Sequence, residues 1–181
     1  NLCNKSIELD KFFFSAQILL GKSFIRENTI DTKQSNINYL KARELFENIF
    51  VQSEKLNDRF WMGRALRNIG NTYWENDIDK SYQYFIQSLE INEELGDKLG
   101  TSQSLHNIGN TYWDKRDMDK AIHFHLRALK IGKEINYHRG IRSSLSFLGY
   151  FYLLKGDFNS SLGYLFQALA LNNEQQDEFK K

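Results

Sequence analysis

Hydrophobic and polar residues are distributed along this chain with the period of an amphipathic helix. Residues 59–76 carry apolar side chains at helical spacing, and residues 81–95 do the same after a short polar break. Such spacing places apolar residues on one side of a helix, where a neighbouring element can bury them. These residues are Met62, Ala65, Leu66, Ile69 and Tyr73 in the first segment and Tyr82, Phe85, Leu89 and Ile91 in the second. The pattern therefore predicts two helices joined by a tight turn.

This pair of helices is repeated along the chain. Residues 67–74 read RNIGNTYW, and residues 106–113, which begin 39 positions later, read HNIGNTYW. The next equivalent glycine is Gly149, and an earlier copy opens at Gly21 and contains a polar insertion at 27–36. Repeats of this length are typical of solenoids, in which each unit packs only on its neighbours. We expect a single array of four units, at about 11–57, 58–96, 97–136 and 137–181.

Short polar residues mark the ends of the expected helices. Asp77, Asp117 and Asp157 each precede the second helix of a unit, and Asp58 and Asp97 precede a first helix. A carboxylate at such a position accepts from unpaired amide groups and meets the positive end of the helix dipole. Second helices should end at residue types that tolerate a left-handed backbone. These are Asn57, Gly96 and Asn136.

The residues that the units share resemble the tetratricopeptide repeat. Each unit has a glycine at the eighth place, an aromatic residue at the eleventh and a small residue at the twentieth, and three units have another small residue near the twenty-seventh. Small residues let two helices approach closely, and aromatic rings fill the space between them. The residues concerned are Gly21, Gly70, Gly109 and Gly149; Phe24, Tyr73, Tyr112 and Tyr152; Ala42, Ser81, Ala121 and Ser161; and Ser88, Ala128 and Ala168.

The period of 39 to 40 residues is similar to that of the longer form of this repeat. That form occurs in kinesin light chains, in Pins-type GoLoco polarity adaptors and in many prokaryotic signalling proteins. The resemblance implies an all-α fold, a right-handed superhelical α-solenoid of about four helix-turn-helix units. The chain departs from the shorter form of the repeat in containing no proline.

Composition and charge narrow the classes of partner. The chain has 41% hydrophobic and 26% charged residues and a net charge of +1, so no global field attracts it to nucleic acid or to membranes. No apolar run reaches the roughly 20 residues of a membrane-spanning helix. Cys3 is the only cysteine and cannot form an internal disulfide, which favours a reducing, cytoplasmic location.

The two ends of the chain suggest that the array continues. Residues 5–9 resemble the last turn of a second helix, and the apolar face of the last helix is followed only by a polar tail. That face consists of Leu162, Leu165, Phe166 and Leu169. We expect either a fragment of a longer repeat protein or a homo-oligomer that forms through exposed terminal helices.

A polar stripe runs along the first helix of each middle unit, opposite its packing face. On a helical wheel these side chains lie within about 100 degrees of one another. They are Arg64, Arg67, Asn68, Asn71 and Glu75 in one unit and Gln103, His106, Asn107, Asn110 and Asp114 in the next. In the fourth unit the stripe changes to Ser143, Ser146, Phe147 and Tyr150.

The resemblance implies a function for this stripe. In Pins-like adaptors and kinesin light chains, asparagines at the corresponding places of the concave groove bind the backbone of an extended peptide; they match Asn68, Asn71, Asn107 and Asn110. A carboxamide suits that role because it both donates and accepts hydrogen bonds. Arg64 matches a groove arginine of the polarity adaptors. With Arg67, Lys22 and Arg26 it would favour an acidic ligand, whereas Tyr150 would offer an apolar wall. The alternative is a merely solvated stripe, copied by duplication.

Other candidate chemistry is weak. His123 and His125 are two residues apart on an expected helix, so their side chains diverge by about 200 degrees and do not suggest a shared metal site. Phe124, between them, is the expected core residue. Trp74 and Trp113 border the stripe and are expected to pack on neighbouring helices. No phosphate loop, nucleophile elbow or paired-carboxylate motif occurs, so we expect neither an enzyme nor a cofactor.

Three functions fit these observations. The first is a scaffold whose concave groove binds a partner peptide or helix. The second is a sensory or regulatory segment of a larger signalling protein, such as a histidine kinase or a transcription regulator. The third is a module that associates with itself through its open ends.

Overall fold

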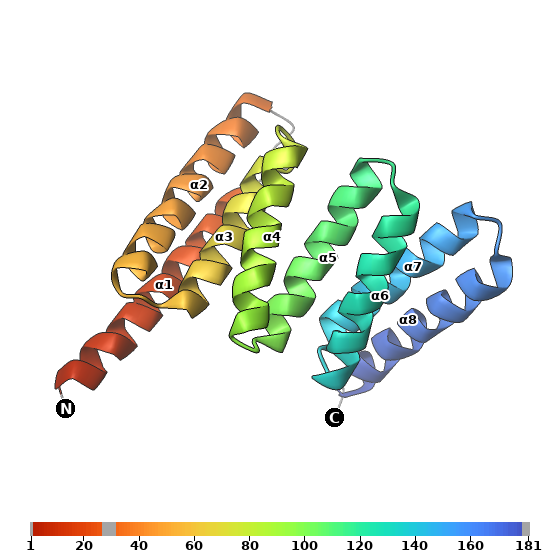
Figure 1. Ribbon diagram of the computed structural model, residues 1–181. Coiled ribbons are helices and arrows are strands. Elements are labelled where there is room, and N and C mark those ends of the chain that lie inside the picture. Colours follow the sequence, from red (N-terminus) through yellow and green to blue (C-terminus); the bar gives the residue numbers. More distant parts are fainter. Residues whose placement is uncertain (1, 27–31, 179–181) are drawn as a thin grey trace. The chain divides into compact units, whose positions relative to one another are not determined.

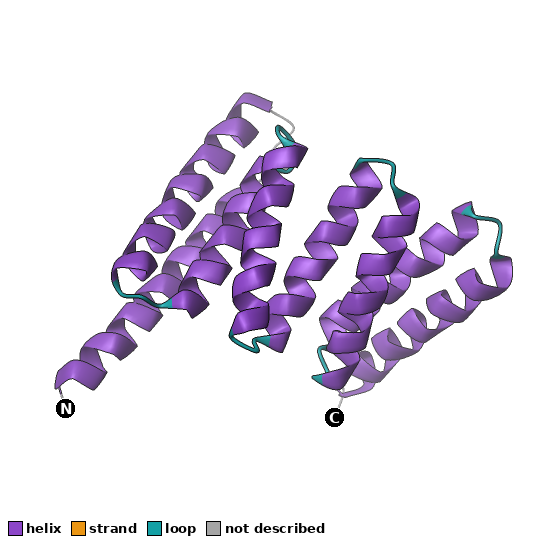
Figure 2. Cartoon of the chain, in the orientation of Figure 1, coloured by secondary structure: helices purple, strands orange, loops and turns teal. Residues whose placement is uncertain are grey.

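The computed structural model describes residues 2–26 and 32–178, with side chains placed over 11–25 and 36–171. All regular structure in these residues is α-helical (Figures 1 and 2). The helices are α1 (Leu2–Arg26), α2 (Thr32–Lys55), α3 (Arg59–Tyr73), α4 (Ile78–Glu94), α5 (Lys98–Asp114), α6 (Met118–Glu134), α7 (His138–Leu154) and α8 (Phe158–Glu178). The expected all-α fold of paired helices is therefore confirmed.

The chain divides into two compact units, unit 1 (residues 1–91) and unit 2 (residues 92–181), a division that the repeat pattern did not indicate. In unit 1, α2 packs against both α1 and α3. In unit 2, α6 packs against both α5 and α7, and α7 packs against α8. Within its unit, each of the second helices α2 and α6 thus lies between the first helix of its own hairpin and the first helix of the next.

The turns follow the local signals in the sequence. Asp77, Asp117 and Asp157 each accept a hydrogen bond from the backbone N–H three residues ahead. Asp58 and Asp97 cap α3 and α5 in the same way. These bonds satisfy amide groups that a helix leaves unpaired in its first turn. Asn57, Gly96 and Asn136 have positive φ, as expected, and so do Arg116 and Gly156 at turns inside the hairpins.

A close contact between glycine and a ring fixes the register of the hairpins. The glycine at the eighth place of the first helix faces Phe46 in the first hairpin, Phe85 in the second and His125 in the third. A Cβ atom added at Gly109 would lie 2.9 Å from the His125 ring, inside van der Waals contact. The absence of a side chain therefore sets the distance between the two helices.

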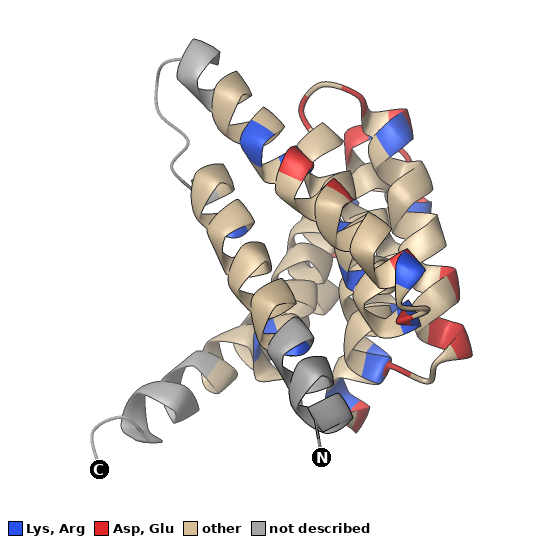
Figure 3. Ribbon diagram, turned by 90° about the vertical axis from the view of Figure 1, so that its left-hand side faces the viewer, with Lys and Arg blue, Asp and Glu red and all other residues tan. Residues whose placement is uncertain are grey.

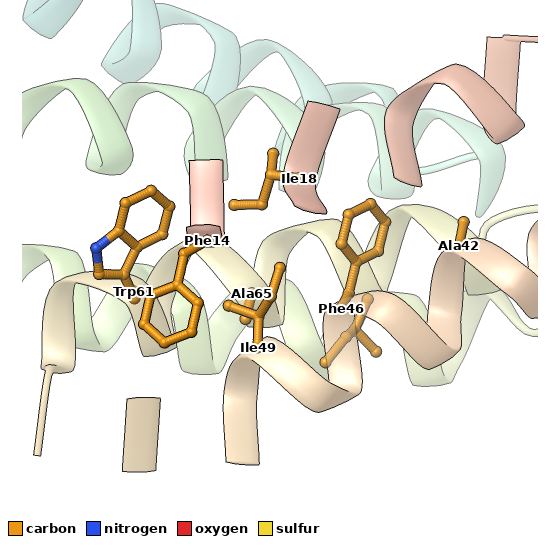
Figure 4. Packing of buried hydrophobic residues seen from close by; sticks show 8 residues of the cluster. Phe14, Ile18, Ala42, Phe46, Ile49, Trp61 and Ala65 are labelled. Carbon is orange, nitrogen blue, oxygen red and sulfur yellow. The ribbon is translucent and has the colours of Figure 1, made fainter. Parts of the chain in front are cut away.

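Each unit has its own hydrophobic core. In unit 1 the buried side chains come from α1, α2 and α3 and point toward one another between the helices (Figure 4). They are Phe14, Ile18, Ala42, Phe46, Ile49, Trp61, Ala65 and Ile69. In unit 2 the cluster joins α6, α7 and α8 through Ala121, Ile122, Leu129, Ile141, Leu145, Leu148, Phe151 and Ala168.

Two expectations about the first helix have separate outcomes. Helix α1 runs without a break from Leu2 to Arg26, so residues 5–9 are not the end of a preceding helix; that expectation is wrong. A helix of uniform period carries no signal that distinguishes its first turns from the last turns of another. Residues 27–31 of the polar insertion and the side chains of Arg26 and Cys3 lie outside the described residues, whereas residues 32–36 belong to α2.

Candidate functional site

The stripe on unit 1 lies on α3, next to α1. Arg64 is half-buried, and its guanidinium lies over the rings of Phe60 and Trp61, 4.4 and 5.5 Å from their centroids. Such stacking holds the cation at the helix surface while leaving its edge N–H groups available to a ligand. Asn71 on α3 and Lys22 on α1 are also half-buried. These three side chains form the accessible polar part of this face together with the exposed Glu75, whose Oε1 accepts a hydrogen bond from Tyr39 Oη at 3.0 Å.

Two predicted residues of this stripe are less accessible than expected. Asn68 is 1% exposed, and its Nδ2 donates to the backbone oxygen of Arg64 at 2.7 Å. The prediction that Asn68 presents its carboxamide to solvent is wrong, because the side chain turns back onto its own helix. Arg67 is also buried. The helical wheel placed both opposite the packing face of a single hairpin, but a stacked first helix is covered on more than one side.

The stripe on unit 2 joins α5 to α7. Gln103 Nε2 donates to Tyr137 Oη at 3.2 Å, and His106 Nε2 lies 3.4 Å from both Asn110 Nδ2 and Ser143 Oγ. Asn107 is half-buried on the same helix. The structure therefore brings Gln103, His106 and Asn110 together with residues of the following hairpin.

Aromatic side chains border this polar group. The Phe147 ring lies edge-on to His106, with centroids 5.6 Å apart, and the exposed Tyr150 ring packs edge-on against Trp113 at 5.5 Å. Trp113 also contacts Phe151, and Trp74 contacts Phe85 in unit 1. Both tryptophans are packing residues, as predicted.

Beneath the stripe of unit 2 lies a buried histidine that the sequence interpretation missed. His125 is fully buried, stacks on Phe147 with centroids 4.9 Å apart, and meets His106 edge-on at the same distance. Phe124 is only half-buried and stacks on Tyr112. The expectation that Phe124 is the core residue is therefore wrong. The signal was present in the register, because His125 aligns with Phe46 and Phe85, which fill the same place.

Burial controls the charge of both imidazoles. It lowers the pKa of His106 to about 4. Burial, and to a smaller extent repulsion from a charged His106, lowers the pKa of His125 to about 3. Neither ring nitrogen of His125 has a hydrogen-bond partner. Both rings are therefore neutral near pH 7, and the polar group on α5 and α7 carries no formal charge.

A cavity on unit 1 was not predicted from the sequence. It has a volume of about 500 Å³ and lies between α2 and α4, over α3. Leu66 and Ile69 form its floor, whereas Glu47, Lys80 and Gln83 lie at its polar rim. It contains none of the stripe residues. The cavity is lined by apolar side chains and by side chains of both charges, and these do not form a catalytic arrangement.

Metal and membrane sites were searched among the described residues. In that part of the chain, no three His, Cys, Asp or Glu side chains are grouped closely enough to hold a metal ion. His123 is exposed while His125 is buried, so the two side chains diverge as expected. None of the described helices combines the length and apolar character needed to cross a membrane.

Comparison with known proteins identifies relatives of this fold. A family model described as tetratricopeptide repeat matches residues 74–134 and 101–174, which together span more than half of the chain. The crystal structure of BtubC (BKLC) from P. vanneervenii is similar, with a TM-score of 0.72 and 17% identity over 92% of this chain and 66% of that chain. This chain thus spans slightly less than two thirds of BtubC.

The crystal structure of MamA is also similar, with a TM-score of 0.57 and 14% identity over 92% of this chain and 93% of that chain. At such identities the likeness concerns the fold alone. No curated protein matches the chain in sequence.

Proposed function

Because the chain belongs to the tetratricopeptide repeat family, we propose that it is a non-catalytic scaffold that binds an extended segment of a partner protein along its first helices. The repeat family supports protein binding as the general activity. The finer proposal is that the polar stripe of α3 in unit 1 and the polar stripe of α5 with α7 in unit 2 each bind a peptide segment. They do so through carboxamide groups, which pair with the peptide backbone without reading its side chains.

The hydrogen bonding of Asn110 carries this proposal. Its Nδ2 lies 3.4 Å from His106 Nε2, a long contact, and its Oδ1 has no hydrogen-bond partner. An unsatisfied acceptor costs about 1–3 kcal/mol relative to a satisfied one. The oxygen is shielded from solvent, so the carboxamide would have to rotate toward the surface for a peptide N–H to reach it and remove that cost. The site is therefore better satisfied with a ligand than without one.

The two stripes favour different parts of a ligand. Lys22 and Arg64 on unit 1 are cationic and fit acidic side chains. On unit 2, the polar group of Gln103, His106 and Asn110 carries no charge and is bordered by Tyr150, so it fits backbone amides and an apolar side chain. We propose that unit 1 recognises acidic side chains and that unit 2 recognises backbone amides beside an apolar side chain.

Selection from a displayed random-peptide library, followed by fluorescence anisotropy of the selected peptides, tests this function. Asn110→Ala should weaken binding about tenfold, as expected for one lost hydrogen bond of about 1.4 kcal/mol. Asn48→Ala, a matched change at an exposed position of α2, should leave the affinity unchanged. Arg64→Gln should weaken the binding of acidic peptides and make their affinity less dependent on salt concentration. Equal affinities for wild type and Asn110→Ala would remove the assignment of this stripe.

A further inference from the structure

We propose that copies of this chain associate head to tail, with the outer face of α8 in one copy packed on the outer face of α1 in the next. This inference goes beyond the peptide scaffold and does not rest on it. It comes from comparing residues at equivalent positions of different repeats. Some apolar residues that are buried on α6 and α7 have exposed apolar equivalents on α8 and α1.

The face of α8 is the first half of the contact. Leu162 and Leu169 are 53% and 54% exposed. Forty positions earlier, Ile122 and Leu129 of α6 occupy the equivalent places and are only 8% and 6% exposed. In unit 2 these two α6 residues belong to the same core cluster as the face of α7. The apolar side chains on α8 are thus suited to contact a helix that occupies the place of α7.

The face of α1 is the complementary half. Phe13 and Leu20 are 53% and 49% exposed. Their equivalents on α7, counted from Gly21 and Gly149, are Ile141 and Leu148, which are both buried in the cluster that contains Ile122 and Leu129. Helix α1 therefore presents apolar residues at the positions that a preceding second helix covers in unit 2.

Both faces also lack the charges that oppose association. Residues 158–171, the part of α8 with described side chains, contain no Lys, Arg, Asp or Glu. The corresponding part of α1, residues 11–25, contains only two residues of these types, Lys11 and Lys22, and Figure 3 shows this helix mostly in tan. Pairing the two faces buries apolar surface without desolvating an ion pair or opposing like charges.

The repeat itself favours this pairing over a symmetric one. Wherever successive hairpins meet within a unit, a second helix contacts a first helix: α2 contacts α3, and α6 contacts α7. An α8–α8 contact would instead join two second helices and leave the face of α1 uncovered. In the head-to-tail contact, a first helix covers the face of α8, as α7 covers α6. A second helix covers the face of α1, as α6 covers α7.

Sedimentation velocity of the 181-residue chain over a wide concentration range tests the association. We expect the wild-type average mass to rise with concentration. Leu162→Glu/Leu169→Glu blocks the face of α8, and Phe13→Glu/Leu20→Glu blocks the face of α1. Each variant alone should sediment as a monomer. An equimolar mixture of the two should form a one-to-one complex, because each retains one intact and complementary face.

Control measurements distinguish loss of the head-to-tail contact from misfolding of a variant and from other modes of association. Leu126→Glu, at an exposed position of α6 equivalent to Phe166 of α8, should associate like wild type. Circular dichroism melting of each variant checks folding before the mixture is scored. A wild-type mass that stays at one chain, or a mixture of folded variants that forms no complex, overturns the proposal. Association of the α1 variant by itself would replace it with a tail-to-tail dimer.

Discussion

His125 occupies a place in the repeat that two other hairpins fill with phenylalanine. The imidazole stacks on Phe147, contacts Phe151 and meets His106 edge-on, and no charged side chain is among these rings. Neither ring nitrogen is hydrogen-bonded, although one of them carries a proton at neutral pH. A buried donor without a partner costs about 1–3 kcal/mol. The His125 ring therefore fills the space that phenylalanine fills in the other hairpins, but its N–H group lacks a hydrogen-bond acceptor.

The first prediction concerns the pH dependence of unfolding. The folded pKa values of His106 and His125 are about 4 and about 3, whereas an unfolded imidazole titrates near 6.5. Below about pH 6.5 the unfolded chain therefore binds protons that the folded chain does not. Stability is full above that pH and falls as the pH drops toward 4, by about 1.4 kcal/mol per pH unit for each imidazole.

His125→Phe should remove the contribution of one imidazole. We expect the variant to unfold with a free energy about 1–2 kcal/mol higher at pH 7, because an unsatisfied donor is lost and the phenylalanine matches Phe85 in the preceding hairpin. The gain should increase between pH 6.5 and 5. Urea unfolding at each pH measures both effects. A wild type and a variant that lose stability in parallel on acidification would contradict the prediction.

At the residue scale, local chemistry explains what the sequence could predict. The aspartate caps and the left-handed turns depend on groups within a few residues, so the sequence alone placed them correctly. Asn68 and His125 depend on which helices lie against them. A wheel drawn for one helix cannot contain that information, and alignment of His125 with Phe85 was the available signal. The peptide-binding role of the remaining stripe residues stays a prediction.

At the scale of the helical elements, the hairpins depend on the close approach at their eighth-place glycines. Gly109 and Gly163 are both helical glycines, on α5 and α8, but only the first faces another helix. A Cβ atom at Gly109 would meet the fully buried His125 ring at 2.9 Å, whereas a Cβ atom at Gly163 would meet nothing within 4 Å. Alanine substitution at Gly109 therefore reports mainly on helix packing, whereas alanine substitution at Gly163 reports mainly on helix propensity.

The same substitution at these positions should have opposite effects. Gly109→Ala should lower the free energy of unfolding by about 1–3 kcal/mol, because the helices must separate or the ring must shift. Gly163→Ala should raise it by up to about 1 kcal/mol, because alanine favours the helix and fits the open space. Thermal melts of the two variants measure the difference. Stabilisation by Gly109→Ala would show that the register of the hairpin is wrong.

The helical elements were the part of the structure most readily predicted from the sequence. Their periodicity, capping residues and repeat spacing all indicate the same boundaries, and the hairpins follow because short turns leave successive helices antiparallel. The start of α1 is the exception, because its first turns have the same period as the rest of the helix. The cavity between α2 and α4 could not be predicted, since its volume depends on side chains from three helices.

At the scale of the whole molecule, the chain consists of successive repeats that fold into two compact units. In such proteins a change in one hairpin acts mainly on its neighbours, because each repeat packs only on adjacent ones. All four histidines of the chain, His106, His123, His125 and His138, fall in unit 2. A proton-linked loss of stability between pH 7 and pH 5 should therefore be unequal along the chain.

Hydrogen exchange measured by mass spectrometry at pH 7 and pH 5, corrected for intrinsic exchange rates, should reveal this inequality. We expect amide protection to fall in residues 92–181 at pH 5 and to change little in residues 1–91. His125→Phe should restore much of the protection in unit 2. His123→Gln, at an exposed position two residues away, should not restore it. Equal losses in both units would mean that acidification acts through carboxylates rather than through the buried imidazoles.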